Sequence, residues 1–206
     1  MRHRVSMLLI SAAVAFASDV AAESRIVAQG RTGAEGDGKS DVVTIVLVSG
    51  HVAKEGCAEG DVLVGRFAVK VRKPSGRTVK TNLNDLVGSP ELRFVPGPAG
   101  MIFFDFTHDG RPCFALAEMS CGNNGFYRFF ALAQNGTVSL LCFAPPPNGR
   151  HIFGNNTIAN DESLRVTKDG FECDTYNNAD GESHTAVFRW MPEQGIFMEV
   201  EEKVSK

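Results

Sequence analysis

The sequence lacks the short motifs that mark common hydrolases and metal sites. It has no G-x-S-x-G segment, which exposes a nucleophilic serine on a strand-to-helix turn, and no H-E-x-x-H zinc motif. A C-x-x-C pair and the Cys/His spacing typical of structural zinc are also missing. Neighbouring acids such as Asp161 and Glu162 point to opposite faces of a strand, or into solvent, and not around one glycosidic bond. We therefore expect a protein that is not an enzyme and that needs no cofactor.

Long apolar runs are scarce as well. The N-terminal run, Val5 to Ala17, is thirteen residues long and is too short to span a bilayer as a helix. A basic segment at 1–4 precedes it and the small residues at 20–22 follow it, an order typical of a secretory signal peptide. We predict a signal peptide over residues 1–22, cleaved after Ala22 or alternatively after Ala17. The expected mature protein is periplasmic or secreted and has no membrane span.

The sequence has no large excess of charge of either sign. Residues 23–206 contain 19 basic and 23 acidic side chains, which gives a formal charge of −4. The sequence shows no basic stripe of the kind that nucleic-acid binding requires, so we expect no nucleic-acid partner. An apolar fraction of 43 % with fifteen phenylalanines is ample for a packed core.

The cysteines are odd in number, five in a chain expected to be exported, where disulfides persist. At least one of them is therefore free or pairs with another molecule. Cys113 and Cys121 lie eight residues apart along one expected strand, about 26 Å in extended chain, which is far beyond disulfide reach. Cys121 with Cys142 and Cys142 with Cys173 are both permitted pairs, and the sequence does not choose between them.

From Val42 onward the pattern is that of β-strands joined by turns. Val42 to Val48 is almost continuously apolar. Within Val62 to Arg72, the residues Phe67, Val69 and Val71 alternate with Ala68, Lys70 and Arg72, which indicates one buried and one wetter face. Asn135-Gly136 between two apolar runs is a strong hairpin signal. A single helical turn is expected at 83–87, capped by Asn82 or Asn84. We predict an all-β fold of antiparallel hairpins in a propeller-like arrangement, with a β-sandwich as the alternative.

The expected domain organisation is simple. Residues 23–41 are rich in glycine and polar residues and lack an apolar period, so we predict a flexible leader there. Residues 42–206 are expected to form a single β-rich domain, in which 42–95 is either the first part of the domain or a separate lobe.

The segment Gly100 to Leu116 combines a strand, an acidic turn and a second strand. Carboxylates at Asp105 and Asp109 followed by Gly110 match part of a calcium-binding loop, in which oxygen ligands alternate before a sharp bend. The candidate ligands are Asp105, Thr107, Asp109 and the backbone carbonyl of Arg111. An EF-hand is excluded because Leu116 occupies the twelfth position. The alternative is a plain β-turn in which aspartate bonds its own backbone.

The segment Asp174 to Ser183, DTYNNADGES, is expected to be a polar loop and a recognition surface. Its aromatic residue, Tyr176, can bury a large area while fixing few torsions. The partner-binding candidates on this loop are Tyr176, Asn177, Asn178, Asp180 and Glu182.

Residues from about Ile102 to Val200 together resemble bacterial periplasmic inhibitor or immunity proteins that act against lysozyme-like cell-wall hydrolases. The similarity rests on the order of four segments. They are Asp105-Phe-Thr-His-Asp109-Gly110 with the strand Phe114-Ala-Leu116, Gly122-Asn-Asn-Gly-Phe-Tyr-Arg-Phe-Phe130, Phe188-Arg-Trp190, and Phe197-Met-Glu-Val-Glu-Glu202. The same acidic turn is shared by the calcium-binding blades of integrin-like repeats.

This resemblance implies a propeller-like β fold and a function of binding without chemistry. A cell-wall hydrolase would be the protein partner, and a polar loop would enter its active-site cleft and exclude the glycan. The loop Asp174 to Ser183 is the first choice and the loop Pro145 to Asn156 the second. Two other functions remain open: a calcium-dependent or structural interaction module of the cell envelope, and a secreted hydrolase.

Overall fold

The chain is described by a computed structural model, which covers residues 25–32, 40–54, 61–95, 100–118, 125–144, 152–153, 157–160, 164–177 and 181–205. Within these ranges one short helix is present and every other regular element is a strand. The prediction of an all-β fold built from antiparallel hairpins is therefore confirmed. None of the helical segments described is long and apolar enough to cross a membrane.

Twelve of the strands form three antiparallel meanders, each with four strands in chain order. The first meander consists of β1 (Ile26–Arg31), β2 (Val42–Lys54), β3 (Asp61–Arg72) and β4 (Thr78–Asn82). The second consists of β6 (Met101–Phe104), β7 (Cys113–Glu118), β8 (Gly125–Leu132) and β9 (Val138–Phe143). The third consists of β12 (Leu164–Val166), β13 (Gly170–Asn177), β14 (Glu182–Met191) and β15 (Ile196–Ser205).

The remaining elements extend these meanders. They are α1 (Leu83–Val87) and β5 (Leu92–Phe94), which follow β4, and β10 (Ile152–Phe153) and β11 (Thr157–Asn160), which follow β9. Strand β5 pairs with the first residues of β3, and β11 pairs with the beginning of β8. The predicted helix cap is confirmed at Asn82, whose side-chain oxygen accepts hydrogen bonds from the backbone N–H groups of Asn84 and Asp85 at 3.1 and 3.4 Å.

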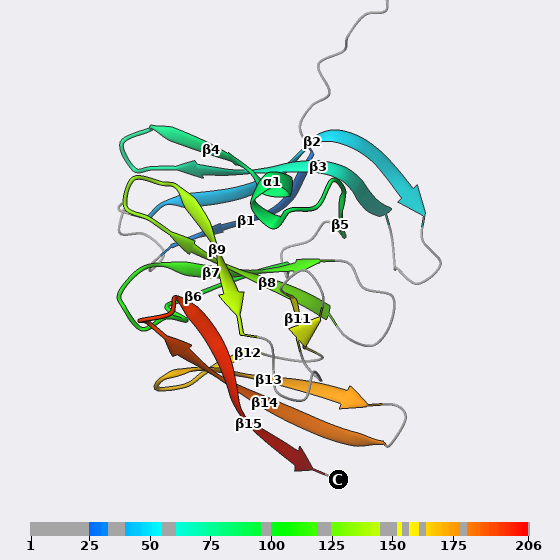
Figure 1. Cartoon of the computed structure of the whole chain (residues 1–206). Helices are drawn as coiled ribbons and strands as arrows, with labels where there is room; N and C mark the ends of the chain where they lie inside the picture. The colour runs from blue at the N-terminus through cyan, green and yellow to red at the C-terminus, as the bar shows by residue number, and fades with distance from the viewer. Residues whose placement is uncertain are drawn as a thin grey trace, which may run out of the picture.

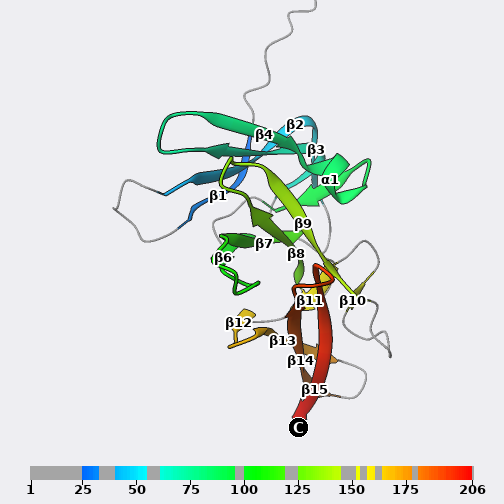
Figure 2. The ribbon, with the colours of Figure 1, turned by 60° about the vertical axis from the view of Figure 1, so that its left-hand side comes forward.

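The three meanders lie one above another, with the second between the other two (Figures 1 and 2). A four-stranded antiparallel meander is the unit that propellers repeat around an axis. Strands β9 and β15 pair in parallel, with Cys142 opposite Ile196 and Phe143 opposite Phe197. This short ladder joins the second and third meanders into one hydrogen-bonded sheet.

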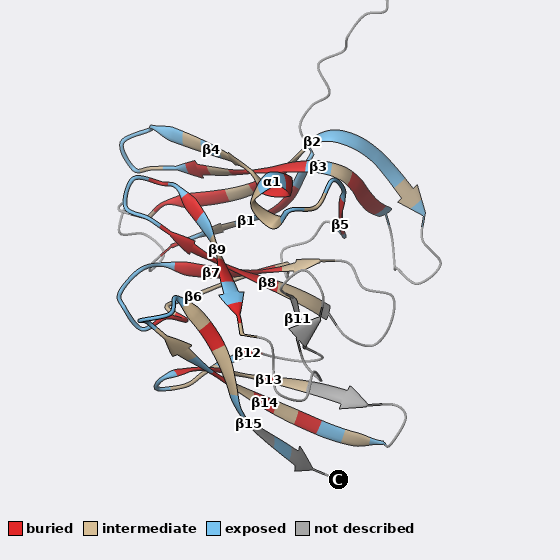
Figure 3. Cartoon of the chain, in the orientation of Figure 1, coloured by how far each residue is buried: buried red, intermediate tan, exposed pale blue. Residues whose placement is uncertain are grey.

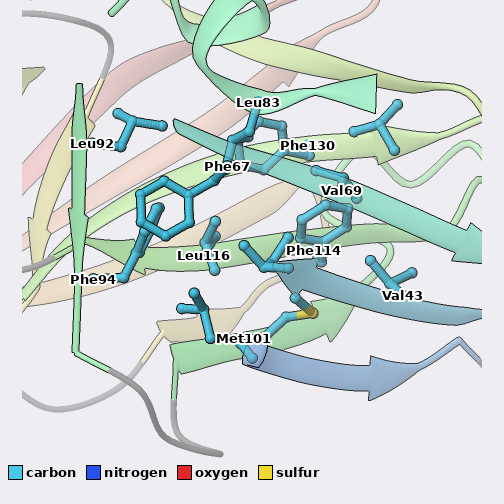
Figure 4. Packing of buried hydrophobic residues seen from close by; sticks show 14 of the residues in the cluster. Val43, Phe67, Val69, Leu83, Leu92, Phe94, Met101, Phe114, Leu116 and Phe130 are labelled. Carbon is cyan, nitrogen blue, oxygen red and sulfur yellow. The ribbon is translucent and has the colours of Figure 1, made fainter. Parts of the chain in front are cut away.

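A first hydrophobic interface lies between the first and second meanders. Five of the side chains that meet here are fully buried (Figure 4). The first meander contributes Val43, Phe67 and Val69, and the second contributes Phe114 and Phe130. Each such side chain contributes about 1.5–3 kcal/mol on burial, which offsets the entropy lost on folding. The first meander therefore shares its core with the second, so residues 42–95 do not form a lobe with a core of their own.

A second hydrophobic interface lies between the second and third meanders. Phe106, Ala115 and Phe129 of the second meander meet Phe171 and Phe188 of the third. Because successive residues of β7 and β8 point to opposite faces, the second meander is buried on both sides (Figure 3). This explains the unbroken apolar runs of these strands, in contrast to the alternation seen in β3.

The flexible leader predicted over residues 23–41 is wrong for part of its length. Residues 26–31 form β1, which pairs antiparallel with β2, and Val27 and Ala28 are buried in the first interface. The strand is stabilised by a non-local partner that the local composition does not reveal. The predicted signal peptide and its cleavage site lie outside the described residues.

Candidate functional site

The acidic turn predicted at Asp105 joins β6 to β7 at the edge of the second interface. Phe106 and Thr107 are 0 and 4 % exposed, so the turn is anchored by its own second and third residues. His108 and Gly110 adopt positive φ values of 56° and 79°, the left-handed conformation that lets the chain reverse here. The turn predicted from the sequence is therefore present, with glycine at a position that requires it.

The side chains of the turn bond to one another. Asp105 Oδ2 accepts a hydrogen bond from the backbone N–H of Gly110 at 2.9 Å, and Thr107 Oγ1 donates to Asp109 Oδ1 at 2.9 Å. Arg111 donates twice to Asp109, from its backbone N–H at 3.0 Å and from its side-chain Nε at 2.7 Å. The hydrogen bond from the Arg111 side chain holds the pKa of Asp109 below its usual range.

This geometry bears on the predicted calcium ligands. The structure brings the side chains of Asp105, Thr107 and Asp109 together, but the guanidinium of Arg111 is already paired with the Asp109 carboxylate. Within the described ranges, no group of three or more His, Cys, Asp or Glu side chains is arranged to hold a metal ion. Calcium binding here remains a prediction that requires Arg111 to leave Asp109.

A small hollow of about 210 Å³ lies beside the acidic turn. It is lined by Thr32 after β1, Phe103 and Phe104 of β6, and Asp105, Gly110, Arg111, Pro112 and Cys113. On the other side of the turn, His108 Nε2 lies 3.4 Å from the backbone carbonyl of Gly170 in β13. The turn therefore connects the second meander to the third as well as reversing the chain.

The segment Asp174 to Ser183 differs from the predicted loop. Strands β13 and β14 pair along eight residue positions, and the ladder continues to Asn177 opposite Glu182. Most of the segment therefore belongs to a β-hairpin, because polar side chains are compatible with a ladder where a sheet face is open to solvent. Tyr176 pairs with Ser183 through its backbone position.

Three of the predicted partner-binding residues, Tyr176, Asn177 and Glu182, therefore lie at the turn end of this hairpin. Tyr176 and Asn177 belong to β13, although the structure does not describe their side chains, and Glu182 begins β14. Asn178 and Asp180 fall outside the described residues, as does most of the second-choice loop at 145–156.

A network of charged side chains covers the outer face of the third meander. Arg165 forms two-pronged contacts with Asp174, one of them 2.8 Å long, and lies 3.4 Å from Glu172. Thr185 donates to Asp174 at 2.6 Å, and Lys203 reaches Glu172 at 3.1 Å. The hydrogen bond from Arg165 lowers the pKa of Asp174. Sequence analysis missed this network, although acids at 172 and 174 on one strand, with a basic residue on the preceding strand, are the signal for it.

The cysteines of the described residues are not bonded to one another. Cys113, Cys142 and Cys173 all carry free thiols, so the predicted Cys142–Cys173 pair is not formed. Cys173 points into the second interface, whereas Cys142 is exposed on β9. Burial raises the pKa of the Cys113 and Cys173 thiols, which makes both poor nucleophiles. Cys121, the other candidate, lies outside the described residues.

Comparison with protein-family models, with curated proteins and with solved structures yields no match to this chain.

Proposed function

We propose that this chain is an exported protein that inhibits a lysozyme-like peptidoglycan hydrolase by placing the turn end of the β13–β14 hairpin in the active-site cleft of the hydrolase. The observation that carries the proposal is the construction of that hairpin. It is paired along eight positions, and its outer face is braced by the contacts of Arg165 with Asp174 and Glu172. A hairpin that is held rigid by such contacts loses little conformational entropy when it enters a cleft.

The charge of the third meander favours such a partner. Residues 164–206 contain nine acidic and five basic side chains, a formal charge of −4, which equals the formal charge of residues 23–206. A hydrolase that binds its substrate through a basic rim would be attracted to this end of the molecule, and opposite charges speed encounter. The β13–β14 hairpin would exclude the glycan by occupying its position in the cleft, and no covalent bond would be made or broken.

Each candidate residue has a distinct role in this proposal. Tyr176 is the aromatic anchor, because a tyrosine buries a large area at a small cost in side-chain entropy. Asn177 and Asn178 supply amide donors and acceptors in place of glycan hydroxyl groups. Asp180 and Glu182 supply carboxylates that face the basic rim or the catalytic acid of the hydrolase.

The test is inhibition of purified lysozyme-type muramidases acting on peptidoglycan. We expect the wild-type protein to inhibit, and Tyr176→Ala to raise the inhibition constant at least tenfold, as loss of an interface anchor does. Gln134→Ala in the exposed turn between β8 and β9 is the matched control and should leave inhibition unchanged. Unfolding curves of both variants would show that the fold is retained.

Absence of inhibition across the muramidases tested would overturn the proposal. Equal inhibition by wild type and Tyr176→Ala would show that Tyr176 is not the anchor and that the inhibitory contact lies elsewhere on the protein. Release of soluble fragments from peptidoglycan by the protein alone would instead favour the secreted-hydrolase alternative.

The calcium-dependent interaction module remains the second candidate. The observation that favours it is the convergence of Asp105, Thr107 and Asp109 within one turn. Calorimetric titration with Ca²⁺ would support it if a tight site appeared that is lost in Asp105→Asn. Absence of binding heat would count against it.

A further inference from the structure

The outer face of the first meander is basic, although the chain as a whole is acidic. Residues 66–80 contain six lysines or arginines and no acidic residue. On β3, Phe67, Val69 and Val71 point into the first interface, so Lys70 and Arg72 point to the opposite face. Strand pairing adds Lys80 of β4 beside Lys70, and Arg31 of β1 in the same row as Arg72. We call these four residues the basic face.

Two of these charges lie directly opposite each other. Lys70 and Lys80 are registered partners on β3 and β4, and like charges in such a pair destabilise a sheet. Arg72 lies two residues along the same face, about 7 Å away. The arrangement therefore costs folding free energy in the isolated protein, and an anion placed over it would remove that cost.

The acids described near the basic face are bonded elsewhere. The four acidic side chains described within 25–95 form ion pairs with basic residues outside the basic face: Asp41 with Lys73, Asp61 with Lys54, Asp85 with Arg66 and Glu91 with Arg93. Across the described part of the chain, no carboxylate lies within ion-pair distance of Lys70, Arg72 or Lys80. These charges are therefore available to a partner.

The basic face extends in two dimensions. It runs across the meander from β1 to β4, about 14 Å at the usual strand spacing, and along β3 from Lys70 to Arg72. Beside it lies a hollow of about 120 Å³, lined by Arg66, Lys80 and the exposed Val48, with Ala68 and Phe67 beneath. Arg31, Arg72 and Lys80 are exposed and Lys70 is half-buried.

We propose that the basic face docks the protein on an anionic phospholipid surface. A membrane presents phosphates as a two-dimensional array, which matches charges spread across four strands better than the single line of a polymer does. No aromatic side chain of the described residues is exposed on this face, which disfavours single-stranded nucleic acid, because such ligands are held by stacking. The hollow between Arg66 and Lys80 can receive one headgroup, with Val48 in contact with the interfacial layer.

Docking of this kind would set the orientation of the whole molecule. The first and third meanders lie at opposite ends of the stack (Figure 1). With the basic face on the membrane, the acidic third meander and its β13–β14 hairpin would point away from the surface. The docking proposal does not depend on what that hairpin binds.

The test is co-sedimentation of the full chain with lipid vesicles. One set contains phosphatidylcholine with phosphatidylglycerol, and the other contains phosphatidylcholine alone. The test variant is Lys70→Gln/Arg72→Gln/Lys80→Gln. The matched control is Lys168→Gln/Arg189→Gln/Lys203→Gln, which removes the same three charges from the third meander, at the other end of the molecule.

We expect wild type and control to bind the anionic vesicles and not the neutral ones. The test variant should bind roughly 100-fold more weakly, from about a fivefold loss for each of the three basic residues removed. Binding should disappear at about 1 M salt, where the screening length falls to about 3 Å. Because the Lys70–Lys80 repulsion is relieved, the test variant should also unfold at a slightly higher urea concentration than wild type.

Three results would overturn the proposal. They are absence of wild-type binding to the anionic vesicles, equal binding of the test and control variants, and equal binding to both kinds of vesicle. Binding to a polyanion such as heparin without binding to vesicles would also overturn it, and would indicate that the basic face binds an anionic polymer instead.

Discussion

The two hydrophobic interfaces on either side of the second meander are built from different residues. Valine, isoleucine and leucine dominate the first interface, where phenylalanine supplies four of seventeen buried residues. Phenylalanine supplies six of thirteen in the second, and most of the others are alanine or cysteine. Branched side chains fill the first interface evenly, whereas large rings alternate with small residues in the second.

The ring geometry follows from this difference. In the second interface Phe129 stacks on Phe171 with centroids 4.7 Å apart, and Phe171 stacks on Phe188 at 5.0 Å. Phe106 meets Phe129 edge-on at 4.9 Å. In the first interface the rings form two smaller groups. Phe67 meets Phe94 at 4.8 Å, and Phe114 meets Phe130 at 5.0 Å and Phe103 at 5.7 Å. The second interface is therefore one connected aromatic cluster, and its stability should depend more strongly on single rings.

The largest effect is expected from truncating neighbouring rings on β8. Phe129 and Phe130 are both fully buried, but they point into the second and the first interface respectively. Either Phe→Ala change should cost about 3–5 kcal/mol of unfolding free energy, measured by urea denaturation. We expect the loss for Phe129→Ala to lie at the upper end of this range, because the Phe129 ring contacts four other rings, at centroid distances of 4.7 to 6.1 Å. Equal losses, or a larger loss for Phe130→Ala, would contradict the comparison.

An intermediate effect is expected from enlarging a small residue of the second interface. Ala186 is fully buried on β14 between Cys173 and the rings around it. Ala186→Val should destabilise the protein by about 1–3 kcal/mol, because the added methyl groups have no space between the rings. Val187→Ile, on the outer face of the same strand, is the control and should change stability by less than about 0.5 kcal/mol. A neutral Ala186→Val would mean that the second interface is loosely packed.

The smallest effect is expected at the acidic turn on the edge of the second interface. Arg111→Gln should cost about 0.2–1 kcal/mol at neutral pH, because the pair with Asp109 is partly exposed. The folded pKa of Asp109 is lowered, so the pair stabilises the protein above the unfolded pKa of about 3.9 and loses this effect as pH falls through the folded pKa. The difference between wild type and variant in urea denaturation should therefore vanish in strongly acidic buffer. A difference that persists there would assign the effect to packing.

Much of the fold is predictable because its signals are local. The hairpin turn at Asn135-Gly136 and the cap at Asn82 depend on residues within a few positions of one another. The apolar runs at 114–116 and 129–132 lie in β7 and β8, which are covered on both faces.

The features that the sequence did not reveal depend on pairing between distant segments. Strand β1 needs β2 as its partner. The basic face is an intermediate case, because three of its four residues lie in the basic segment 66–80 and only Arg31 is added by the pairing of β1 with β2. In the candidate site, the polar composition of Asp174 to Ser183 suggested a loop, but strand pairing holds most of the segment as a hairpin.

The burial of the second meander on both faces has a consequence for synthesis from the N-terminus. The first interface is complete once residues up to about 143 have emerged, but the second needs β12–β15. Until then Phe106, Phe129 and Phe143 present an aromatic surface to solvent, next to unpaired strand edges. A chain interrupted before β15 would keep that surface open, and such surfaces promote aggregation.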